Sequence, residues 1–459
     1  MLRMSVPRYR FGRRPTCGGN DRRWYPCLTS SRRLRYGPDA WGPVVIGRRV
    51  PPVWLLGMTN LSFGLYTGFL VLPLPQALSA QHVAESTIAS TTALVVSPTF
   101  FCFLLGPILD VRFSRRWYAS VLTLLASLLL GISILFMGDL LVVKIAATIG
   151  CAAIVLANGA LGGWLASISG AEDENRLGTW ITIGNICGVG VISVFAGEAL
   201  RAWPLPAVAA AVAGLVLVPL AIFPWIPAPG PDRRLASESF RAFSGDLLNL
   251  VRRPSVLVAI ALFVAPCGTF ALTNLLGGLG NDFHASARVV NWLGGIGSAI
   301  AGVFGSLLLP PLARRVPIRP LYLMIGIGGA MFTLSMLLLP RTAGAFSLTY
   351  IGEQAVQSLA IACSMGITFE VIGQNNPLAA TTFALLNAAY NFPITYMLIV
   401  DGWGYAWRRI DGAFLVDAGL GMSACLLVGL LLPASRGKSS ESRCPRVERG
   451  AEAVQGQVE

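Results

Sequence analysis

The sequence predicts an all-α integral membrane protein with about twelve transmembrane helices in two six-helix pseudo-repeats. Three observations support this prediction: the composition, the length of the apolar runs and a weak internal symmetry. Of 459 residues, 54% are hydrophobic and 12% are charged, with a mean hydropathy of +0.65, whereas a soluble domain is about 25% charged. Apolar runs of about 20 residues, the length that spans a bilayer as a helix, recur along most of the chain.

Twelve apolar segments are expected to cross the membrane as helices, because a helix satisfies its own backbone hydrogen bonds in lipid. They divide the chain into an N-terminal bundle (51–225) and a C-terminal bundle (256–433), joined by a cytoplasmic linker (226–255). An Arg-rich N-terminal tail (1–50) and a C-terminal tail (434–459) are expected to be disordered and cytoplasmic. With boundaries defined to about 2–4 residues, the segments are 53–75, 86–109, 117–137, 140–168, 177–199, 205–225, 256–279, 289–312, 320–340, 345–371, 379–401 and 411–433.

Basic residues predict that both termini lie on the cytoplasmic side of an inner membrane. An even number of spans puts both ends on one side, and short cytoplasmic loops carry an excess of Lys and Arg. With the N-terminus inside, the cytoplasmic segments hold 29 of the 35 Lys and Arg residues, and without residues 1–50 the count is still 17 against 6. The net charge of +13 therefore indicates orientation and not a nucleic-acid partner. The Arg-rich tail is interpreted as a lipid-binding segment, as a disordered extension, or as the product of a start codon assigned too far upstream.

An internal symmetry indicates that one six-helix unit was duplicated. Three pairs of residues recur at nearly one offset and at equivalent places in the two halves. His82 and His284, 202 positions apart, lie in the outer loop after the first span of their halves. Pro107 and Pro311, 204 apart, lie at the cytoplasmic end of the second span. Asn175 and Asn376, 201 apart, lie at the start of the fifth span.

The stretch GPILDVRFSRR, residues 106–116, places an acid and three arginines where the second span ends. It resembles the signature G-x-x-x-D-(R/K)-x-G-R-(R/K) of the major facilitator superfamily. The residues concerned are Gly106, Asp110, Arg112, Arg115 and Arg116. In three departures, Val111 follows the aspartate, the second glycine is missing and the arginine pair comes one residue late.

The resemblance implies a conformational latch. Asp110 would accept charge-assisted hydrogen bonds from neighbouring helix ends and arginines, and so hold the cytoplasmic face closed while the protein is open outward. The alternative is a loop whose arginines only set the topology.

Three further stretches resemble the AmpG-type muropeptide permeases and the related acetyl-CoA transporters of that superfamily. They are GFLVLPLPQAL (68–78), ENRLGTWITIGNICGVG (174–190) and AATTFALLNAAYNFPITYMLIVDGWGYAW (379–407). The resemblance covers most of residues 53–433 in layout but only these patches in sequence. It implies the major facilitator fold and proton-coupled transport of a small organic solute such as a muropeptide, by alternating access. Siderophore or drug transport stays open as an alternative, as does a non-transporting membrane assembly or sensor protein on the same fold.

Acidic side chains inside the apolar runs are candidates for proton coupling, because a polar group in hydrocarbon is costly. Glu353 lies inside the tenth span, with Gln357 on the same helix face at i+4 and Tyr350 at i−3. A low-dielectric surrounding disfavours the charged carboxylate, so Glu353 is the first candidate for carrying the proton. Asp417, in the last span, is the second. Either acid has the alternative role of bonding to a neighbouring helix for structure.

Amide and phenol side chains in the spans are the candidate substrate contacts. Asn387 and Asn391 share a helix face at i and i+4, with Tyr390 beside them. Asn60, in the first span, and Gln357 complete the set. Interhelical hydrogen bonding explains a lone membrane asparagine equally well.

Enzyme and cofactor signatures are missing from the sequence. It has no H-E-x-x-H, Walker or G-x-S-x-G motif, so an enzymatic reaction is not indicated. Its nine cysteines include no C-x-x-C pair and are expected to act mostly as small core residues. The expected partners are a small-molecule substrate and the lipid bilayer, with no cofactor, no metal and no nucleic acid, and the protein is expected to be a monomer.

Overall fold

A computed structural model describes residues 44–45, 48–111, 113–228, 249–250, 252–267, 270–276, 278–374 and 376–431. They lie in one compact unit, Ala40–Glu459, and include ten helices that are long and apolar enough to cross a membrane. The predicted all-α membrane fold is therefore confirmed. Within the described residues the regular structure is helical apart from one antiparallel strand pair, β1 (Val44–Val45) with β2 (Arg48–Arg49). Most of the two predicted tails and of the predicted linker lies outside the described residues, so the predicted domain boundaries stay predictions.

The N-terminal half contains α1 to η2, and polar caps or prolines mark several of its helix ends. Ser114 caps α6, its Oγ accepting from Trp117 N at 3.2 Å, and Asp139 caps α7, its Oδ1 accepting from Leu141 N at 2.9 Å. Pro73 opens α3, where a missing N–H costs nothing. The elements are α1 (Val53–Met58), α2 (Leu61–Val71), α3 (Pro73–Ala80), α4 (Glu85–Val96), α5 (Pro98–Phe101), η1 (Cys102–Asp110), α6 (Arg115–Leu135), α7 (Leu140–Ile168), α8 (Glu174–Ala202), α9 (Leu205–Leu217) and η2 (Val218–Trp225).

The C-terminal half contains α11 to α18, and its first crossing is broken. The prediction of one continuous helix over 256–279 is wrong, because α11 ends at Val264 and Ala265 is extended. Pro266 follows, and a proline disfavours helical backbone in the residue before it. The elements are α11 (Pro254–Val264), α12 (Phe270–Leu276), η3 (Gly280–Phe283), α13 (Ala287–Trp292), the π-helical turn η4 (Leu293–Gly297), α14 (Ser298–Leu307), α15 (Leu309–Ala313), α16 (Ile318–Met336), α17 (Ala343–Ile372) and α18 (Ala379–Leu431).

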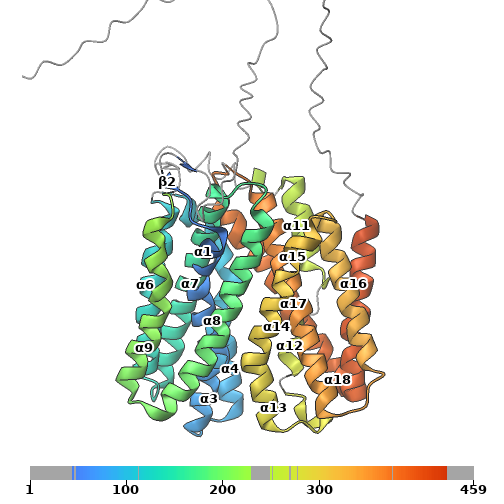
Figure 1. The fold of residues 1–459 in the computed structure, drawn as a ribbon. Helices are drawn as coiled ribbons and strands as arrows, with labels where there is room; N and C mark the ends of the chain where they lie inside the picture. The colour runs from blue at the N-terminus through green and yellow to red at the C-terminus, as the bar shows by residue number, and fades with distance from the viewer. Residues whose placement is uncertain are drawn as a thin grey trace, which may run out of the picture. The chain divides into compact units, whose positions relative to one another are not determined.

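The 53-residue α18 makes two crossings. Its backbone is not helical at Arg408 (φ −138°, ψ 27°) and Arg409 (φ 55°, ψ −139°), where the chain turns back. The resulting arms, 379–407 and 410–431, correspond to the predicted spans 379–401 and 411–433. With the two arms counted separately and the broken α11–α12 crossing included, each half has six crossings. Figure 1 shows the blue-to-green helices of the N-terminal half beside the yellow-to-red helices of the C-terminal half.

The two histidines support the predicted duplication. His82 (φ 60°) follows α3 and His284 (φ 56°) follows η3, so each ends the first crossing of its half. Among the described residues, only these two and Arg409 have a positive φ without being glycine. A left-handed residue other than glycine is uncommon, although histidine adopts the conformation more readily than most. Equivalent left-handed turns at equivalent places are therefore expected of two copies of one unit.

Polar contacts join the loops of the C-terminal half beside the α18 turn. Arg341 forms an ion pair with Asp411, and its guanidinium lies 5.1 Å from the centre of the Phe283 ring. The Tyr405 hydroxyl donates to Asp282 Oδ2 at 2.9 Å. Burial lowers the pKa of the Arg341 guanidinium, and the Asp282 carboxylate acts in the opposite direction. Arg341 therefore links the loop before α17 to the α18 turn and to η3.

We expect Arg341→Gln to lower the free energy of unfolding by about 1 kcal/mol, since its ion pair is partly exposed and a surface pair contributes little. Thermal unfolding of the purified protein measures the effect. Arg288→Gln is the control, because Arg288 is exposed and forms no ion pair within the described residues. Equal unfolding temperatures for the two variants would contradict the expectation.

Candidate functional site

The Asp110 carboxylate binds the first turn of α18 across the two halves. Asp110 ends η1 in the N-terminal half, and its side chain is buried. It accepts hydrogen bonds from Ala380 N at 3.2 Å, from Thr381 N at 2.8 Å and from Thr381 Oγ1 at 2.7 Å. The first N–H groups of a helix have no partner within the helix and carry partial positive charge. A carboxylate from the other half therefore caps this helix.

Arg115 strengthens the same contact. Its Nε donates to Asp110 Oδ1 at 2.8 Å, and its Nη2 donates to Asn376 O at 3.1 Å and to Pro377 O at 3.0 Å. The residue is 3% exposed, so these bonds form away from water, where charge-assisted hydrogen bonds are strong. Asp110 and Arg115 together join η1 and α6 to the start of α18 and to the loop before it.

The other residues of the GPILDVRFSRR stretch contribute differently. A Cβ added to Gly106 would lie 3.3 Å from the Ala384 Cβ, so this glycine allows close contact between the halves. Arg116 lies within its own half, with its guanidinium carbon 5.9 Å from the centre of the Trp164 ring. Arg112 lies outside the described residues. The hydrogen bonds expected of the motif are thus made by Asp110 and Arg115, and Gly106 adds a close packing contact that was not predicted.

Glycines bring the two halves together at the end of the molecule where Asp110 lies, which we call the Asp110 end. A Cβ on Gly163 of α7 would lie 2.5 Å from Ala380 N, and one on Gly178 of α8 would lie 2.7 Å from Gly366 N of α17. Real Cβ atoms essentially never approach other atoms below 3.0 Å. One apolar cluster contains Trp164 from the N-terminal half together with residues of α17 and α18. The halves are therefore in backbone contact at this end.

A cavity of about 550 Å³ lies between the halves at the opposite end, which we call the cavity end. Gln76 and Arg201 lie in the last turns of the first and fifth crossings, Val53–Ala80 and Glu174–Ala202. Asp110 ends the second crossing, Ser86–Asp110, which runs in the opposite direction. The cavity is therefore at the end of the molecule away from Asp110. The cavity is lined by Leu72, Gln76, Ser193, Val194, Gly197, Glu198, Arg201, Val290, Trp292, Gly294, Gly295, Ile296 and Tyr350.

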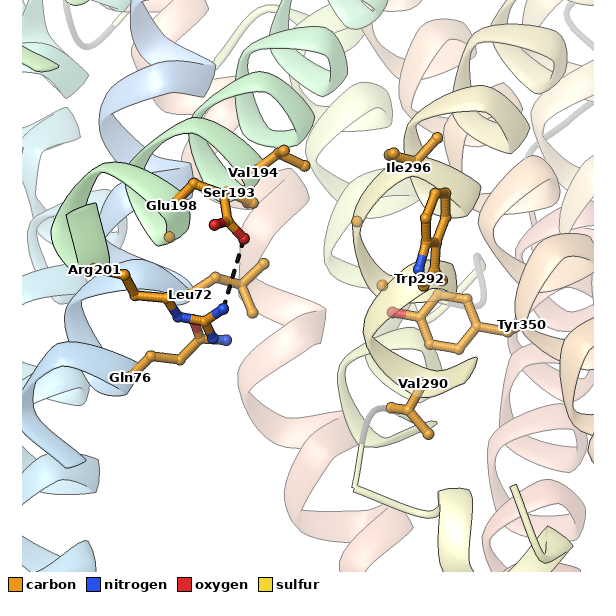
Figure 2. A pocket seen from close by; sticks show the side chains of 13 residues that line it. Leu72, Gln76, Ser193, Val194, Glu198, Arg201, Val290, Trp292, Ile296 and Tyr350 are labelled. Atoms are coloured by element: carbon orange, nitrogen blue, oxygen red, sulfur yellow. Dashed lines mark ion pairs between the residues drawn. The ribbon is translucent and has the colours of Figure 1, made fainter. Parts of the chain in front are cut away.

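The two walls of the cavity differ in chemistry. Figure 2 shows Gln76 and the Glu198–Arg201 pair on the wall of the N-terminal half, and Trp292 and Tyr350 on the facing wall. Glu198 Oε1 and Arg201 Nη1 are 3.6 Å apart, and both side chains are more than three-quarters exposed. One wall thus offers charges of both signs and an amide, and the other offers aromatic surface and a hydroxyl.

The polar residues predicted in α17 point to different places. Tyr350 lines the cavity. Glu353 is fully buried and accepts a hydrogen bond from the Thr333 hydroxyl of α16. Gln357 Oε1 accepts from the Thr273 hydroxyl of α12 at 2.9 Å. The shared helix face inferred from spacing therefore meets three different neighbours.

The five predicted substrate contacts, Asn60, Gln357, Asn387, Tyr390 and Asn391, are not among the side chains that line this cavity. Asn60 Nδ2 donates to Ile181 O of α8 at 3.3 Å, which joins the break between α1 and α2 to a neighbouring helix. Asn391 Nδ2 donates to the Asn387 carbonyl of its own helix at 2.8 Å. The Tyr390 ring lies edge-on to Phe263, with centroids 6.0 Å apart.

Asp417 and an acid that sequence reasoning missed, Asp401, are both buried in α18. The first arm was predicted to end at residue 401, which would put Asp401 at the membrane boundary. The helix instead continues to residue 407 and turns at Arg408. The stretch from Gly402 to Trp407 carries no charge and no proline, which is the signal that a longer span was possible.

The sequence profile of the Major Facilitator Superfamily matches residues 53–382. The chain belongs to the major facilitator superfamily. Superfamily membership and the apolar helices indicate a multi-pass integral membrane protein that acts as a secondary transporter and not as an enzyme. The predicted AmpG-type branch stays a prediction. No curated protein matches the sequence.

Solved structures of low sequence identity share the fold of this chain. The proton:xylose symporter XylE bound to 6-bromo-6-deoxy-D-glucose is 15% identical, with a TM-score of 0.64, over 83% of this chain and 96% of that chain. The transporter FucP in the outward conformation is 13% identical, with a TM-score of 0.60, over 82% and 98%. The human organic anion transporter MFSD10 is 15% identical, with a TM-score of 0.58, over 82% and 97%. At these identities the likeness shows the fold alone.

We expect Asp110→Asn to open the Asp110 end, because the neutral amide cannot replace the charge-assisted bonds to Arg115 and to the α18 amides. Loss of a bond worth about 1.5–3 kcal/mol shifts the balance of two conformations by about tenfold or more. Hydrogen–deuterium exchange at Ala380 and Thr381 is the measurement, and it should become correspondingly faster. Asp139→Asn is the control, since Asp139 caps its own helix and asparagine is an equally good cap. Unchanged exchange in Asp110→Asn would return the motif to a purely topological role.

We expect Gly178→Ala to favour the same opening by a different cause, because the added methyl group meets Gly366 N. Overpacking of this kind costs about 1–3 kcal/mol. Exchange at Ala380 and Thr381 should again rise, although neither amide contacts residue 178. The matched control is Gly214→Ala, since a Cβ there meets nothing within 4 Å. Identical exchange in both alanine variants would show that the glycine contact does not hold the end closed.

Proposed function

We propose that this protein is a proton-coupled secondary transporter that moves a small organic solute across the inner membrane by alternating access. The observation that carries the proposal is the asymmetry between the two ends: the halves are in backbone contact at the Asp110 end and face each other across a cavity of about 550 Å³ at the other. Rocking of the two six-helix units would close the cavity end and open the Asp110 end. The protein is proposed to work as a monomer in the lipid bilayer.

The excess of basic residues at the Asp110 end supports an orientation with both termini cytoplasmic. In this orientation the described conformation is open to the outside, and the bonds of Asp110 and Arg115 act as the cytoplasmic latch. The latch would have to break once in every transport cycle. Its charge-assisted bonds are therefore proposed to set how long the protein stays open outward.

The walls of the cavity support a solute with both polar and apolar groups. Charges of both signs, an amide and hydroxyls suit a molecule with carboxylate, ammonium and sugar groups, and Trp292 offers a surface on which a sugar ring can stack. A muropeptide combines these groups, which agrees with the AmpG-type resemblance. The proton:xylose symporter with the same fold supports a small organic solute and proton coupling. A siderophore or a drug is the alternative solute, and a non-transporting assembly or sensor protein is the alternative function.

Glu353 and Asp417 are the proposed coupling residues. Both are buried in the C-terminal half, and a buried carboxyl takes up a proton more readily than an exposed one. The hydrogen bond from Thr333 to Glu353 fits either protonation state of the acid, and it also fits a purely structural role.

Uptake into proteoliposomes tests the function and the solute together. The purified protein is reconstituted and an inward pH gradient is imposed, with a labelled muropeptide, a siderophore and a cationic drug as separate probes. Accumulation of one probe above its outside concentration, abolished by a proton ionophore, is the expected result. Uptake that depends on neither the pH gradient nor the membrane potential would contradict proton coupling. Binding of a probe without uptake of any probe would favour the non-transporting alternative.

We expect Glu353→Gln to abolish accumulation driven by the pH gradient while exchange of labelled for unlabelled solute persists. Glutamine matches the protonated acid in shape and hydrogen-bonding capacity but cannot release a proton. Counterflow and gradient-driven uptake are measured on the same proteoliposome preparation. The control is Glu172→Gln, since Glu172 is exposed in the loop between α7 and α8. Equal loss of both activities would assign Glu353 a structural role, and wild-type accumulation would place the proton site elsewhere.

A further inference from the structure

The two arms of α18 are in backbone contact near their turn. A Cβ added to Gly404 of the first arm would lie 2.6 Å from Gly412 O and 3.1 Å from Ala413 Cα of the second arm. Neither glycine could carry a side chain without separating the arms. The two arms are therefore held close together at this point.

Two aspartates lie one turn beyond this contact, one on each arm. Asp401 precedes Gly404 by three residues, and Asp417 follows Ala413 by four, so each lies on the helix face of its own contact residue. Because the arms are antiparallel, the two residues reach about the same depth, roughly 10 Å from the turn. Asp401 is 0% exposed and Asp417 is 2% exposed, so both carboxyls are buried at this depth.

Neither acid has the full set of hydrogen-bond donors that surrounds Asp110. Both carboxyl oxygens of Asp401 and Oδ2 of Asp417 have no hydrogen-bond partner within the described residues. Asp110, by comparison, accepts from two backbone amides, a hydroxyl and a guanidinium. A buried carboxylate without donors or a cation is strongly disfavoured, and a second carboxylate beside it adds repulsion.

The helices of the C-terminal half that pack against α18 supply no free cation to this place within the described residues. Of the helices that pack on it, α11 and α12 carry no charged side chain. Arg319 of α16 is bonded to Glu370 at the Asp110 end, and Glu353 of α17 is bonded to Thr333. At the turn, Arg341 pairs with Asp411, Arg408 lies over Trp407, and Arg409 is exposed. The other titratable groups near the two arms are the Asp282 carboxyl, which accepts from Tyr405, and the phenols and thiols of Tyr322, Tyr390, Tyr396, Tyr405, Cys267 and Cys425.

We infer that Asp401 and Asp417 form a carboxyl pair that binds a proton inside the C-terminal half in the conformation described. The pair is separate from the cavity and from the Glu353 contact. Any part that it plays in transport rests on the proposed proton coupling, whereas the proton binding itself does not. Asp417 thereby has a partner, and Asp401 is a second proton-binding residue.

Infrared spectroscopy of the wild-type protein tests the inference without a solute. Protein in lipid nanodiscs is labelled with ¹³C at the aspartate carboxyl and titrated between about pH 5 and pH 9, where ordinary aspartates are ionised. The expected result is a protonated-carboxyl band at about pH 7 that shifts with the label. A spectrum without a label-sensitive protonated carboxyl at that pH would overturn the inference, whatever any variant does.

Variants assign the band to the pair. In Asp401→Asn and in Asp417→Asn the remaining acid should lose its proton at a pH lower by about one unit or more, because the neighbouring negative charge is gone. The double variant should lack the band. Asp139→Asn, in which an exposed helix cap is replaced by an equivalent one, should leave it unchanged. A band that persists in the double variant, or single variants that titrate as the wild type does, would refute the assignment.

The uptake assay separates this inference from the proposed function. A band that depends on the pair in a protein that transports none of the probes would sustain the proton site and reject the transporter proposal. Gradient-driven uptake without the band would sustain the transporter proposal and reject the pair. The infrared titration and the uptake assay are both made on the same preparation of purified protein.

Discussion

The capping of α18 by Asp110 is the interaction on which the described conformation depends. A helix begins with N–H groups that have no partner of their own, and two of those in α18 are bonded by a side chain from the other half. Arg115 holds that carboxylate and also bonds the loop carbonyls before the helix. The contact is directional, because each bond needs the helix end and the carboxylate in one relative position. Apolar packing cannot supply such a constraint in lipid, where neighbouring helices gain little by excluding hydrocarbon.

Close packing and bulky side chains divide the interface between the halves into two different ends. At the Asp110 end, Gly163 and Gly178 let the backbones touch, and the carboxylate contact forms only at that separation. At the cavity end, Trp292, Tyr350 and Arg201 line the facing walls, and the space for a solute lies between them. Interfaces of this kind have two discrete arrangements and do not deform continuously. A molecule that binds in the cavity can favour closure only through contacts that it gains when the walls approach.

The fold was predictable because its determinants are local, whereas the site was predictable only in part. The length of the apolar runs predicted the crossings. An offset of about two hundred residues predicted the duplication, which the left-handed turns at His82 and His284 support.

Asp110 and Arg115 were found because the motif is a short contiguous stretch. Gln76, Ser193 and Trp292 were not found, because helix tilt and the separation of the halves decide which helix ends face the cavity. Asp401 was missed because its arm extends beyond an average span before the turn at Arg408. Spacing placed Glu353, Gln357 and Tyr350 together, but each meets a different neighbour, which no periodicity specifies.

The positions of the buried acids constrain how coupling can work in the proposed transporter. Glu353, Asp401 and Asp417 are all in the C-terminal half and none lines the cavity, whose ionic groups, Glu198 and Arg201, belong to the N-terminal half. In the proposed transporter, a proton on these acids would therefore act on the solute through the arrangement of helices and not by direct contact. Such coupling requires that the two conformations differ in proton affinity. Proton binding then changes the affinity for the solute by the same factor by which solute binding changes the affinity for the proton. The acids meet this requirement if the movement of α16, α17 and the two arms of α18 changes their burial. The C-terminal half is then more than a rigid wall of the cavity, because its internal packing has to change along with the opening of the Asp110 end.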